Sequence, residues 1–153
     1  MYLQFGKYTK DYPKSLLIKI KKIKKGKSEK QYIVKVLKAI REEFDPRNYK
    51  VTYTNDFKKS RFISAANVLK KRQRSCGSLA TIVASILRNL GYPTKLIDGF
   101  YIKDNSKMRH AWNEVFINKK WLQFDISRKN LRIGKYHIRK KEWIDWGDLE
   151  KIY

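Results

Sequence analysis

The most regular pattern of apolar positions in the chain lies between residues 76 and 90. Ser75 precedes it as a suitable N-cap, Gly91 follows as a suitable C-terminal cap, and Pro93 prevents continuation. The apolar side chains recur at spacings of three and four residues, which places them on one face of a helix: Leu79, Ile82, Val83, Ile86, Leu87 and Leu90. The pattern therefore predicts a buried helix over 76–90.

The upstream part of the chain has shorter patterns. Residues 2–12 show no clear period and are predicted to form a coil on the surface. Apolar and other residues alternate over 16–21, which predicts a short edge strand with its lysines outward. Ser28 and Gln31 fit a capping box, and helical spacing continues to Asp45-Pro46, so we expect a helix there. Two further elements are expected before the central helix: a strand over 49–54 and a short helix over 60–71.

Downstream of the central helix the pattern becomes extended. Residues 96–102 are predicted to form a largely buried strand, with Gly99 at a bulge or a close approach of another chain segment. A polar loop over 103–109 is expected next. Two strands, 110–117 and 121–125, flank a short polar connection and predict a hairpin. The last 28 residues are expected to cover one side of the sheet and to end in a short helix.

The hairpin brings two polar residues within reach of one another. A two-residue turn at Asn118-Lys119 pairs the strands so that Asp125 lies opposite Trp112 and diagonal to His110. Diagonal neighbours are roughly 7–8 Å apart between Cα atoms, a gap that two side chains can span. A three-residue loop would turn Asp125 to the other face. The geometry is therefore possible from sequence but is not forced by it.

Composition limits the class of protein. At 153 residues with 42% hydrophobic side chains, the chain is expected to form a single domain over 1–153 with a core of its own. One cysteine excludes an internal disulfide framework and suggests a reducing compartment. Residues 1–15 have no apolar run typical of a signal peptide, and no stretch approaches the length of a membrane span. We therefore expect a cytoplasmic protein without a transmembrane segment; the oligomeric state is left open.

The net charge of +23 is the unusual feature, from 37 Lys and Arg against 14 Asp and Glu. Such a charge attracts polyanions, so the lysine-rich segment 19–30 and the basic segment 128–141 could contact nucleic acid or another polyanion non-specifically. A solvated surface explains the same residues, and we favour that interpretation.

The candidate chemistry centres on the single cysteine. Cys76 would lie in the first turn of the central helix, where the helix dipole favours the thiolate, and Arg72 and Arg74 act in the same direction. A cysteine nucleophile needs a base and an orienting acceptor, roles for which His110 and Asp125 are candidates. The alternative is that Cys76 is simply a small core residue.

The sequence gives little support for a catalytic role of the second histidine or for a metal site. His137 lies in a strongly basic segment and is expected to be a surface residue. One cysteine, two histidines and no clustered carboxylates offer few ligands for a zinc or calcium site, so we expect no metal.

Four motifs in order resemble the transglutaminase-like superfamily, whose members are related to papain-type cysteine proteases. They are Cys76 at a helix start, Leu-Arg-Asn-Leu-Gly-Tyr-Pro over 87–93, His-Ala-Trp-Asn-Glu-Val over 110–115, and Trp121-x-x-x-Asp125. The resemblance covers about residues 60–127. It implies an α+β fold in which the cysteine helix packs on an antiparallel sheet. It also implies Cys76 as nucleophile, His110 as general base and then acid, Asp125 as its orienter, and chemistry that needs no cofactor.

The resemblance has gaps at the oxyanion hole. Transglutaminases use a tryptophan upstream of the cysteine, whereas every tryptophan here lies downstream. The backbone N–H of Cys76 is one expected donor by its position. Gln73 is a weak candidate for the second, since a solvated loop glutamine is the commoner case. The residue before the cysteine, often glycine in the family, is Ser75.

The sequence leaves three functions open. The favoured one is a thiol enzyme acting on amide bonds of a peptide or protein through an acyl-enzyme, as a cysteine peptidase or amidase. If an amine replaces water as acceptor, the protein is a transglutaminase. The alternative of another class is a basic polyanion-binding or nucleic-acid-binding module on the same fold.

Overall fold

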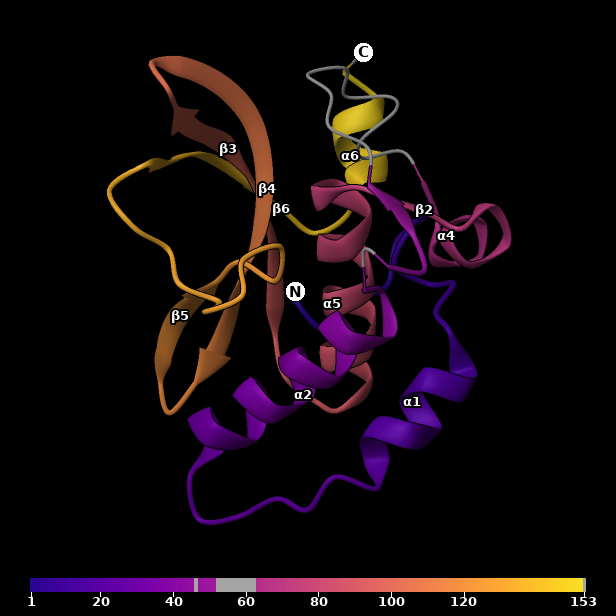
Figure 1. Ribbon diagram of the computed structural model, residues 1–153. Coiled ribbons are helices and arrows are strands. Elements are labelled where there is room, and N and C mark those ends of the chain that lie inside the picture. The colour runs from indigo at the N-terminus through magenta and orange to yellow at the C-terminus, as the bar shows by residue number, and fades with distance from the viewer. Residues whose placement is uncertain (46, 52–62, 153) are drawn as a thin grey trace.

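The computed structural model describes residues 1–45, 47–51 and 63–152. Helix α5 (Cys76–Asn89) runs through the middle of the molecule, with a four-stranded sheet on one side and helices α1 (Lys14–Lys21) and α2 (Glu29–Glu43) on the other (Figure 1). This arrangement is the α+β fold that the sequence predicts.

The central helix forms where the apolar pattern places it. Ser75 is its N-cap: Ser75 Oγ accepts from the Ser78 N–H at 3.2 Å, and Ser78 Oγ accepts from the Ser75 N–H at 2.8 Å. This reciprocal capping box satisfies donors that a helix end would otherwise leave unused. Gly91 adopts φ 89° after the last turn, a left-handed conformation natural for glycine. The predicted helix is therefore confirmed, and its first residue is Cys76.

The main sheet is antiparallel and has the strand order β5-β4-β3-β6. Helix α5 packs against its two central strands, and the Asn113 amide donates to the Ala80 carbonyl at 3.0 Å across that contact. The four strands are β3 (Thr94–Lys103), β4 (Ser106–Ile117), β5 (Lys120–Phe124) and β6 (His137–Trp143).

Glycine 99 marks a close approach in β3, as predicted. A Cβ at this position would lie 2.3 Å from the Ile138 carbonyl oxygen and 2.5 Å from the Trp112 ring. The pairing of β3 with β6 also shifts register between Asp98 and Gly99. Only glycine allows β6 and the tryptophan to lie this close to β3.

Two predictions for the downstream half are wrong. The polar loop expected over 103–109 is mostly strand, because the chain turns at Asp104 and Asn105, with φ 51° and 61°, and enters β4 at Ser106. The last 28 residues are expected to cover one side of the sheet, but part of them, His137–Trp143, instead forms β6, an edge strand beside β3. Most of β6 is exposed, so its sequence lacks the apolar alternation that would have revealed it. The predicted terminal helix is confirmed as α6 (Trp146–Glu150).

The edge strand predicted over 16–21 is also wrong, because these residues lie in α1. Leu16, Leu17 and Ile20 are buried while Ile18 is 60% exposed, a helical and not an alternating pattern. The segment 2–12 has no helix or strand, as expected, but Tyr8 and Thr9 are buried and not on the surface.

The remaining helices and strands lie between these parts. Helix α2 follows its predicted cap, with the Gln31 N–H donating to Ser28 Oγ at 3.2 Å. Strand β1 (Lys50–Val51) pairs in parallel with β2 (Gln73–Arg74), and α4 (Ala65–Lys71) precedes β2. Residues 52–54 of the predicted strand and residues 60–62 of the predicted helix lie outside the described residues.

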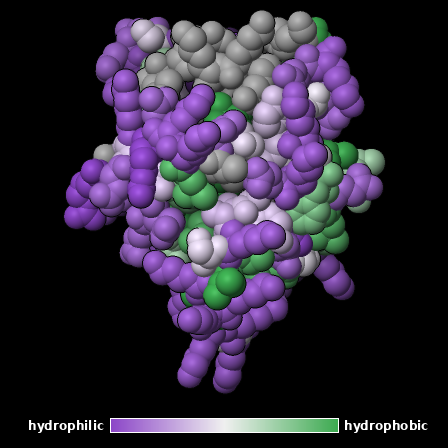
Figure 2. Space-filling model, turned by 90° about the vertical axis from the view of Figure 1, so that its right-hand side faces the viewer, coloured by the Kyte–Doolittle hydropathy of each residue, from purple (hydrophilic) through white to green (hydrophobic). Residues whose placement is uncertain are grey.

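Hydrophilic side chains dominate the face shown in Figure 2, with smaller hydrophobic patches between them. Within the described part of the chain, no helix combines the length and apolar character needed to cross a membrane.

Candidate active site

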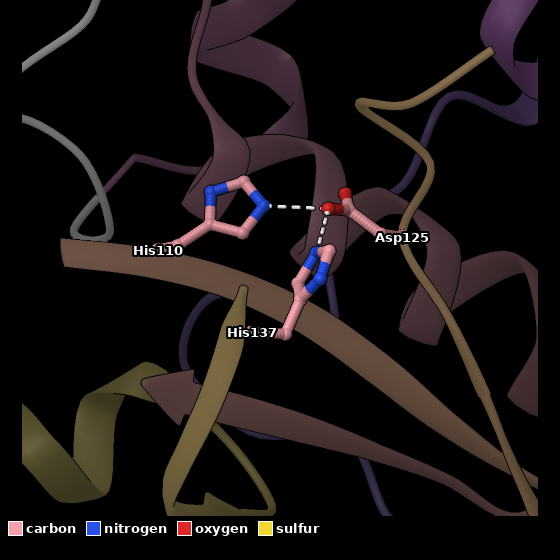
Figure 3. Close-up of side chains that lie close together, drawn as sticks. All are labelled: His110, Asp125 and His137. Carbon is pink, nitrogen blue, oxygen red and sulfur yellow. Dashed lines mark hydrogen bonds and ion pairs between the residues drawn. The ribbon is translucent and has the colours of Figure 1, made fainter. Parts of the chain in front are cut away.

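The hairpin of β4 and β5 sets the geometry of the site. Its strands close at the Ile117–Lys120 pair, and the two turn residues, Asn118 and Lys119, have φ 51° and 64°. Positive φ at both positions is typical of a type I′ turn, so the predicted two-residue connection is confirmed. The register carries His110 and Asp125 to one face, and the distance from His110 Nε2 to Asp125 Oδ2 is 2.7 Å (Figure 3).

Cys76 completes a row with these two residues. It opens α5 and lines the same cleft as His110, and its side chain forms a hydrogen bond with that imidazole. Because His110 Nε2 is hydrogen-bonded to Asp125, the hydrogen bond with the Cys76 sulfur must involve the other ring nitrogen, Nδ1. Of the two arginines expected to favour the thiolate, Arg74 lines the cleft, whereas the Arg72 guanidinium lies over the Tyr49 ring.

Asp125 is buried and fully used as an acceptor. Its Oδ1 accepts from the Ser127 N–H at 3.0 Å and from Ser127 Oγ at 2.5 Å, and its Oδ2 lies 2.7 Å from His110 Nε2 and 2.8 Å from His137 Nε2. Burial alone would raise the pKa of this carboxyl, but the hydrogen bonds from the two histidines and Ser127 outweigh it and hold the pKa well below its usual range. Asp125 is therefore a carboxylate at any physiological pH.

His137 was expected on the surface, and that expectation is wrong. Its side chain is 1% exposed, and it approaches Asp125 from β6 (Figure 3). The Gly134 N–H donates to His137 Nδ1 at 3.1 Å, so Nδ1 must hold a lone pair and Nε2 must carry the proton. His137 is thus a neutral imidazole that donates its Nε2–H to Asp125.

The two histidines consequently differ in protonation. Burial lowers the pKa of His110. The hydrogen bonds with Asp125 and Cys76, together with the charges of those two residues, raise it by more than burial lowers it, and the pKa rises from 6.5 to about 10. His110 is held as an imidazolium between the Asp125 carboxylate and the Cys76 sulfur, whereas His137 acts as a neutral donor. This is the arrangement expected of an activated cysteine beside its acid–base partner.

His110, Asp125 and His137 are also the side chains that lie close enough together to hold a metal ion. Among the described residues, ligand atoms of His110, Asp125 and His137 lie within 4.8 Å of one another. A metal at His137 Nε2 would move that proton to Nδ1, which would then face the Gly134 N–H as a second donor. The donor pattern therefore suits a hydrogen-bonded cluster, while the expectation of no metal stays a prediction.

A cleft of about 410 Å³ opens onto the row of Cys76, His110 and Asp125. Its volume is within the range of small-ligand and peptide side-chain pockets. Gln73, the weak candidate for a second oxyanion donor, has an exposed side chain on β2 and is not among the described residues that line the cleft. The structure thus gives no support to Gln73, and the Cys76 N–H at the helix start remains the predicted donor.

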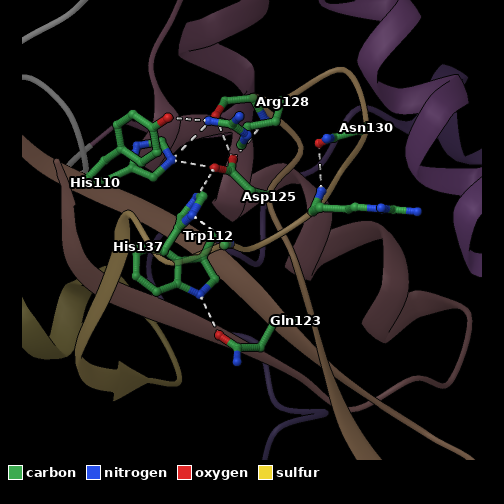
Figure 4. Close-up of polar contacts among 11 residues, drawn as sticks. His110, Trp112, Gln123, Asp125, Arg128, Asn130 and His137 are labelled. Carbon is green, nitrogen blue, oxygen red and sulfur yellow. Dashed lines mark hydrogen bonds and ion pairs between the residues drawn. The ribbon is translucent and has the colours of Figure 1, made fainter. Parts of the chain in front are cut away.

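Aromatic and cationic side chains hold the histidines in place. The Tyr101 ring lies 5.9 Å from the His110 ring and 5.0 Å from the His137 ring, between centroids. Arg128 Nη1 donates to the Tyr101 hydroxyl at 2.6 Å, and the Arg128 backbone N–H donates to the Asp125 carbonyl at 3.1 Å (Figure 4). Below them, the Trp112 indole N–H donates to Gln123 Oε1 at 3.2 Å.

The sequence analysis did not predict two of the residues that donate hydrogen bonds to Asp125, namely Ser127 and His137. Ser127 follows Asp125 by two positions, which is the spacing of an Asx turn, so this contact could have been predicted. His137 could not, because its position depends on an edge strand that has no apolar alternation.

Comparisons with known proteins agree with the geometry. The family model described as the transglutaminase-like superfamily matches residues 19–126, which include Cys76, His110 and Asp125. The chain belongs to the transglutaminase-like superfamily. His137 and β6 lie beyond the matched stretch. No curated protein matches the chain.

Solved structures share the fold of this superfamily member. A candidate cysteine protease from Cytophaga hutchinsonii has a TM-score of 0.68 at 20% identity, over 96% of this chain and 47% of that one. A structure described as a TGase, with no organism given, has a TM-score of 0.53 at 18% identity, over 80% of this chain and 34% of that one. The periplasmic domain of TgpA from Pseudomonas aeruginosa, bound to ethylmercury, has a TM-score of 0.51 at 19% identity, over 82% and 47%. The chain spans less than half the length of each.

Proposed function

We propose that this protein is a thiol enzyme that cleaves amide bonds through an acyl-enzyme, acting as a cysteine peptidase or amidase. The observation that carries the proposal is the row of Cys76, His110 and Asp125, with His110 hydrogen-bonded on one side to the sulfur and on the other to the carboxylate at 2.7 Å. Nucleophile, acid–base group and orienter are each within reach of the next, as this chemistry requires.

The proposed reaction has two steps, acylation of Cys76 and hydrolysis of the resulting thioester. The Cys76 thiolate attacks the carbonyl carbon, a C–S bond forms, and the carbonyl electron pair moves to oxygen near the Cys76 N–H. His110 then gives its proton to the amide nitrogen as the C–N bond breaks, which releases an amine and leaves a thioester. Water attacks that thioester while His110 takes its proton, and the carboxylic acid leaves as the thiolate re-forms. The raised pKa of His110, about 10, means that its proton is available at neutral pH.

The supporting role of His137 is to hold the orienter. Its Nε2–H and the two donors of Ser127 fix both oxygens of Asp125, so the carboxylate cannot rotate away from His110. His137 and Ser127 thus fix the orientation of the Asp125 carboxylate, so that its Oδ2 is the oxygen that contacts His110.

Mass spectrometry of the intact protein and of its products tests the proposal. The protein is incubated with a peptide library, with and without a primary alkylamine, and Cys76→Ala serves as the control. We expect a thioester adduct on Cys76 and free carboxylic acid products. Amine-linked products in place of acids would favour the transglutaminase alternative. No adduct and no product under any condition would contradict the proposed enzyme.

A further inference from the structure

We infer that a groove between α2 and β5 is a docking site for an acidic peptide segment of a partner protein, one that also carries apolar side chains. The groove has a volume of about 570 Å³ and is lined by one side of α2, by residues 121–124 of β5 and by residues 129–133. It shares no described lining residue with the cleft that opens onto Cys76, so it is a second site on the molecule.

The two basic segments of the sequence meet at this groove. Lys30 belongs to the lysine-rich segment 19–30, whereas Lys129 and Arg132 belong to the basic segment 128–141. Lys38 follows Lys30 by eight residues, about two helical turns, and lines the groove from the same side of α2. All four of these side chains are exposed. The fold therefore gathers cations from distant parts of the chain around one hollow.

These four cations have no carboxylate beside them in the part of the chain that the structure describes. None of them forms an ion pair with a described residue. No Asp or Glu is among the described residues that line the groove. Unpaired cations alone would mean little, because 37 Lys and Arg face only 14 Asp and Glu in this protein. The informative observation is that these cations surround a hollow that also has apolar side chains.

The apolar lining distinguishes the groove from an ordinary cationic surface. Four apolar side chains of the lining are half-buried and still reach its surface: Val34, Trp121, Leu122 and Ile133. Covering such surface with a partner's apolar side chain is favourable, and the cations at the same site attract carboxylates. The distance along α2 from Lys30 to Lys38 is about 12 Å, the length of about four residues of extended chain. A short acidic segment that contains leucine-like side chains fits both properties.

The segment 129–133 is held in place by its own contacts. The Leu131 carbonyl accepts from the Asp125 N–H at 3.0 Å, and the Leu131 N–H donates to the Arg128 carbonyl at 3.0 Å. The Leu131 side chain is buried, and the Arg132 N–H donates to Asn130 Oδ1 at 3.0 Å (Figure 4). A site that is already formed does not have to be ordered when a ligand binds, which favours affinity.

Nucleic acid is the other polyanion that such a groove could attract, and the aromatic side chains argue against it. Single-stranded nucleic acids bind largely by stacking bases on open aromatic faces. Phe124 is buried, and Lys95 Nζ lies over the Trp121 ring, 4.1 Å from its centroid. The Tyr2 ring meets the same Trp121 ring edge-on at 5.5 Å. The groove therefore offers bases little to stack on, and an acidic peptide is the better match.

Fluorescence anisotropy with the full chain and labelled ligands tests the inference. The first ligand is a capped octapeptide of six glutamates and two leucines, and the second replaces both leucines with serine at the same charge. We expect the leucine peptide to bind about tenfold more tightly at physiological salt, because its apolar side chains are covered in the groove. Equal affinity of the two peptides, or no binding of either, would overturn the inference.

An oligoadenylate of the same net charge is the third ligand. It should bind more weakly than the leucine peptide, since its phosphates can use the cations but its bases cannot stack. Binding as tight as that of the leucine peptide, or tighter, would assign the groove to nucleic acid and overturn the peptide assignment.

Single-charge variants show whether the groove itself is the site. Lys38→Gln and Arg132→Gln should each weaken binding of the leucine peptide about threefold. Lys35→Gln is the matched control, because Lys35 is exposed on the same helix but is not among the residues that line the groove. Each variant removes one positive charge from an exposed position. An equal loss of affinity for Lys35→Gln would show that only net charge matters and would overturn the inference.

Cys76→Ala separates this site from the proposed enzyme. The variant should bind the leucine peptide as tightly as the wild type does, because Cys76 lines the other cleft. Failure of the wild type to cleave amides would therefore leave the docking site standing. A large loss of peptide affinity in Cys76→Ala would place the peptide in the catalytic cleft and overturn the inference.

Discussion

Two aspartates, Asp125 and Asp145, are buried to nearly the same extent, with 1% and 2% of their surface exposed. Each accepts hydrogen bonds on both oxygens, yet the donors differ in kind. Asp145 binds the Tyr8 and Thr9 N–H groups, the Thr9 hydroxyl and the Gly147 N–H, at 2.7–3.2 Å. Asp125 binds two imidazoles and Ser127. Backbone amides and hydroxyls keep their protons during catalysis, whereas an imidazole such as that of His110 can give up and take up a proton.

One buried aspartate therefore joins two parts of the fold, and the other holds the imidazole of the proposed acid–base group. Asp145 ties the N-terminal segment to the start of α6, two parts of the chain far apart in sequence. Arg88 reinforces that junction by donating to the Gln4 and Ile144 carbonyls at 2.7 Å each. Asp125 instead orients a group that faces an open cleft. Removing donors from Asp125 should therefore mainly lower the reaction rate, whereas removing donors from Asp145 should mainly lower the stability of the fold.

The largest effect is expected from removing the titrating donor of Asp125. His110→Ala should lower amide cleavage, or Cys76 acylation, by about 10³–10⁴-fold, because no group remains to move the proton. Thr9→Val, which removes a donor from Asp145, should leave the rate per folded molecule unchanged. Steady-state kinetics and thermal unfolding of both variants check this; a comparable rate loss in Thr9→Val would abolish the contrast.

The second effect compares the carboxylates themselves. Asp125→Asn should lower the rate about 10²-fold, less than loss of the base, since the imidazole stays and only its orientation and charge partner are degraded. Asp145→Asn should keep the rate but lower the free energy of unfolding by about 1–3 kcal/mol, because its amide group meets buried donors. Denaturant titration and kinetics on the same samples separate the two; a stable Asp145→Asn variant with impaired catalysis would reverse their roles.

A third, smaller effect concerns the neutral donor, His137. His137→Ala removes the Nε2–H bond to Asp125 and should lower the rate about tenfold. His137→Gln retains an N–H donor and should recover most of that loss, whereas a role limited to packing beside Trp112 would not depend on the N–H. The readout is kcat at saturating substrate together with the melting temperature. Equal rates for the alanine variant and the wild type would show that Ser127 alone holds the carboxylate.

Much of the site could be predicted because two local rules determine it. The helical period and the Ser75 cap place Cys76 at the start of α5. The strand alternation and a two-residue turn place Asp125 beside His110. Both rules act over a few residues, so they need no knowledge of the tertiary fold.

The wrong predictions, for α1 and β6, concern elements that depend on contacts between distant parts of the chain. In the segment that became α1, a short apolar run satisfies both the helical and the alternating period, and the exposure of Ile18 settles the matter only after folding. In β6, charged side chains such as Arg139 face solvent or pair with Glu114, which gives the sequence the look of a solvated loop. His137 was missed for this reason, since its approach to Asp125 depends on β6 pairing with β3.

The smallest predicted effect is a dependence of stability on pH that Asp125 introduces. Its pKa is lowered in the folded protein relative to about 3.9 for an unfolded chain. The unfolded carboxyl therefore takes up a proton first as the pH falls, and the stabilisation present above about pH 4 is lost below it. The advantage of the wild type over Asp125→Asn in the free energy of unfolding should shrink between pH 4 and pH 2. Urea titrations of both proteins at pH 7, 4, 3 and 2 measure it. A constant difference across this range would mean that the histidines and Ser127 do not favour the ionised form of Asp125, and the distinction between the two buried aspartates would then have to rest on catalysis alone.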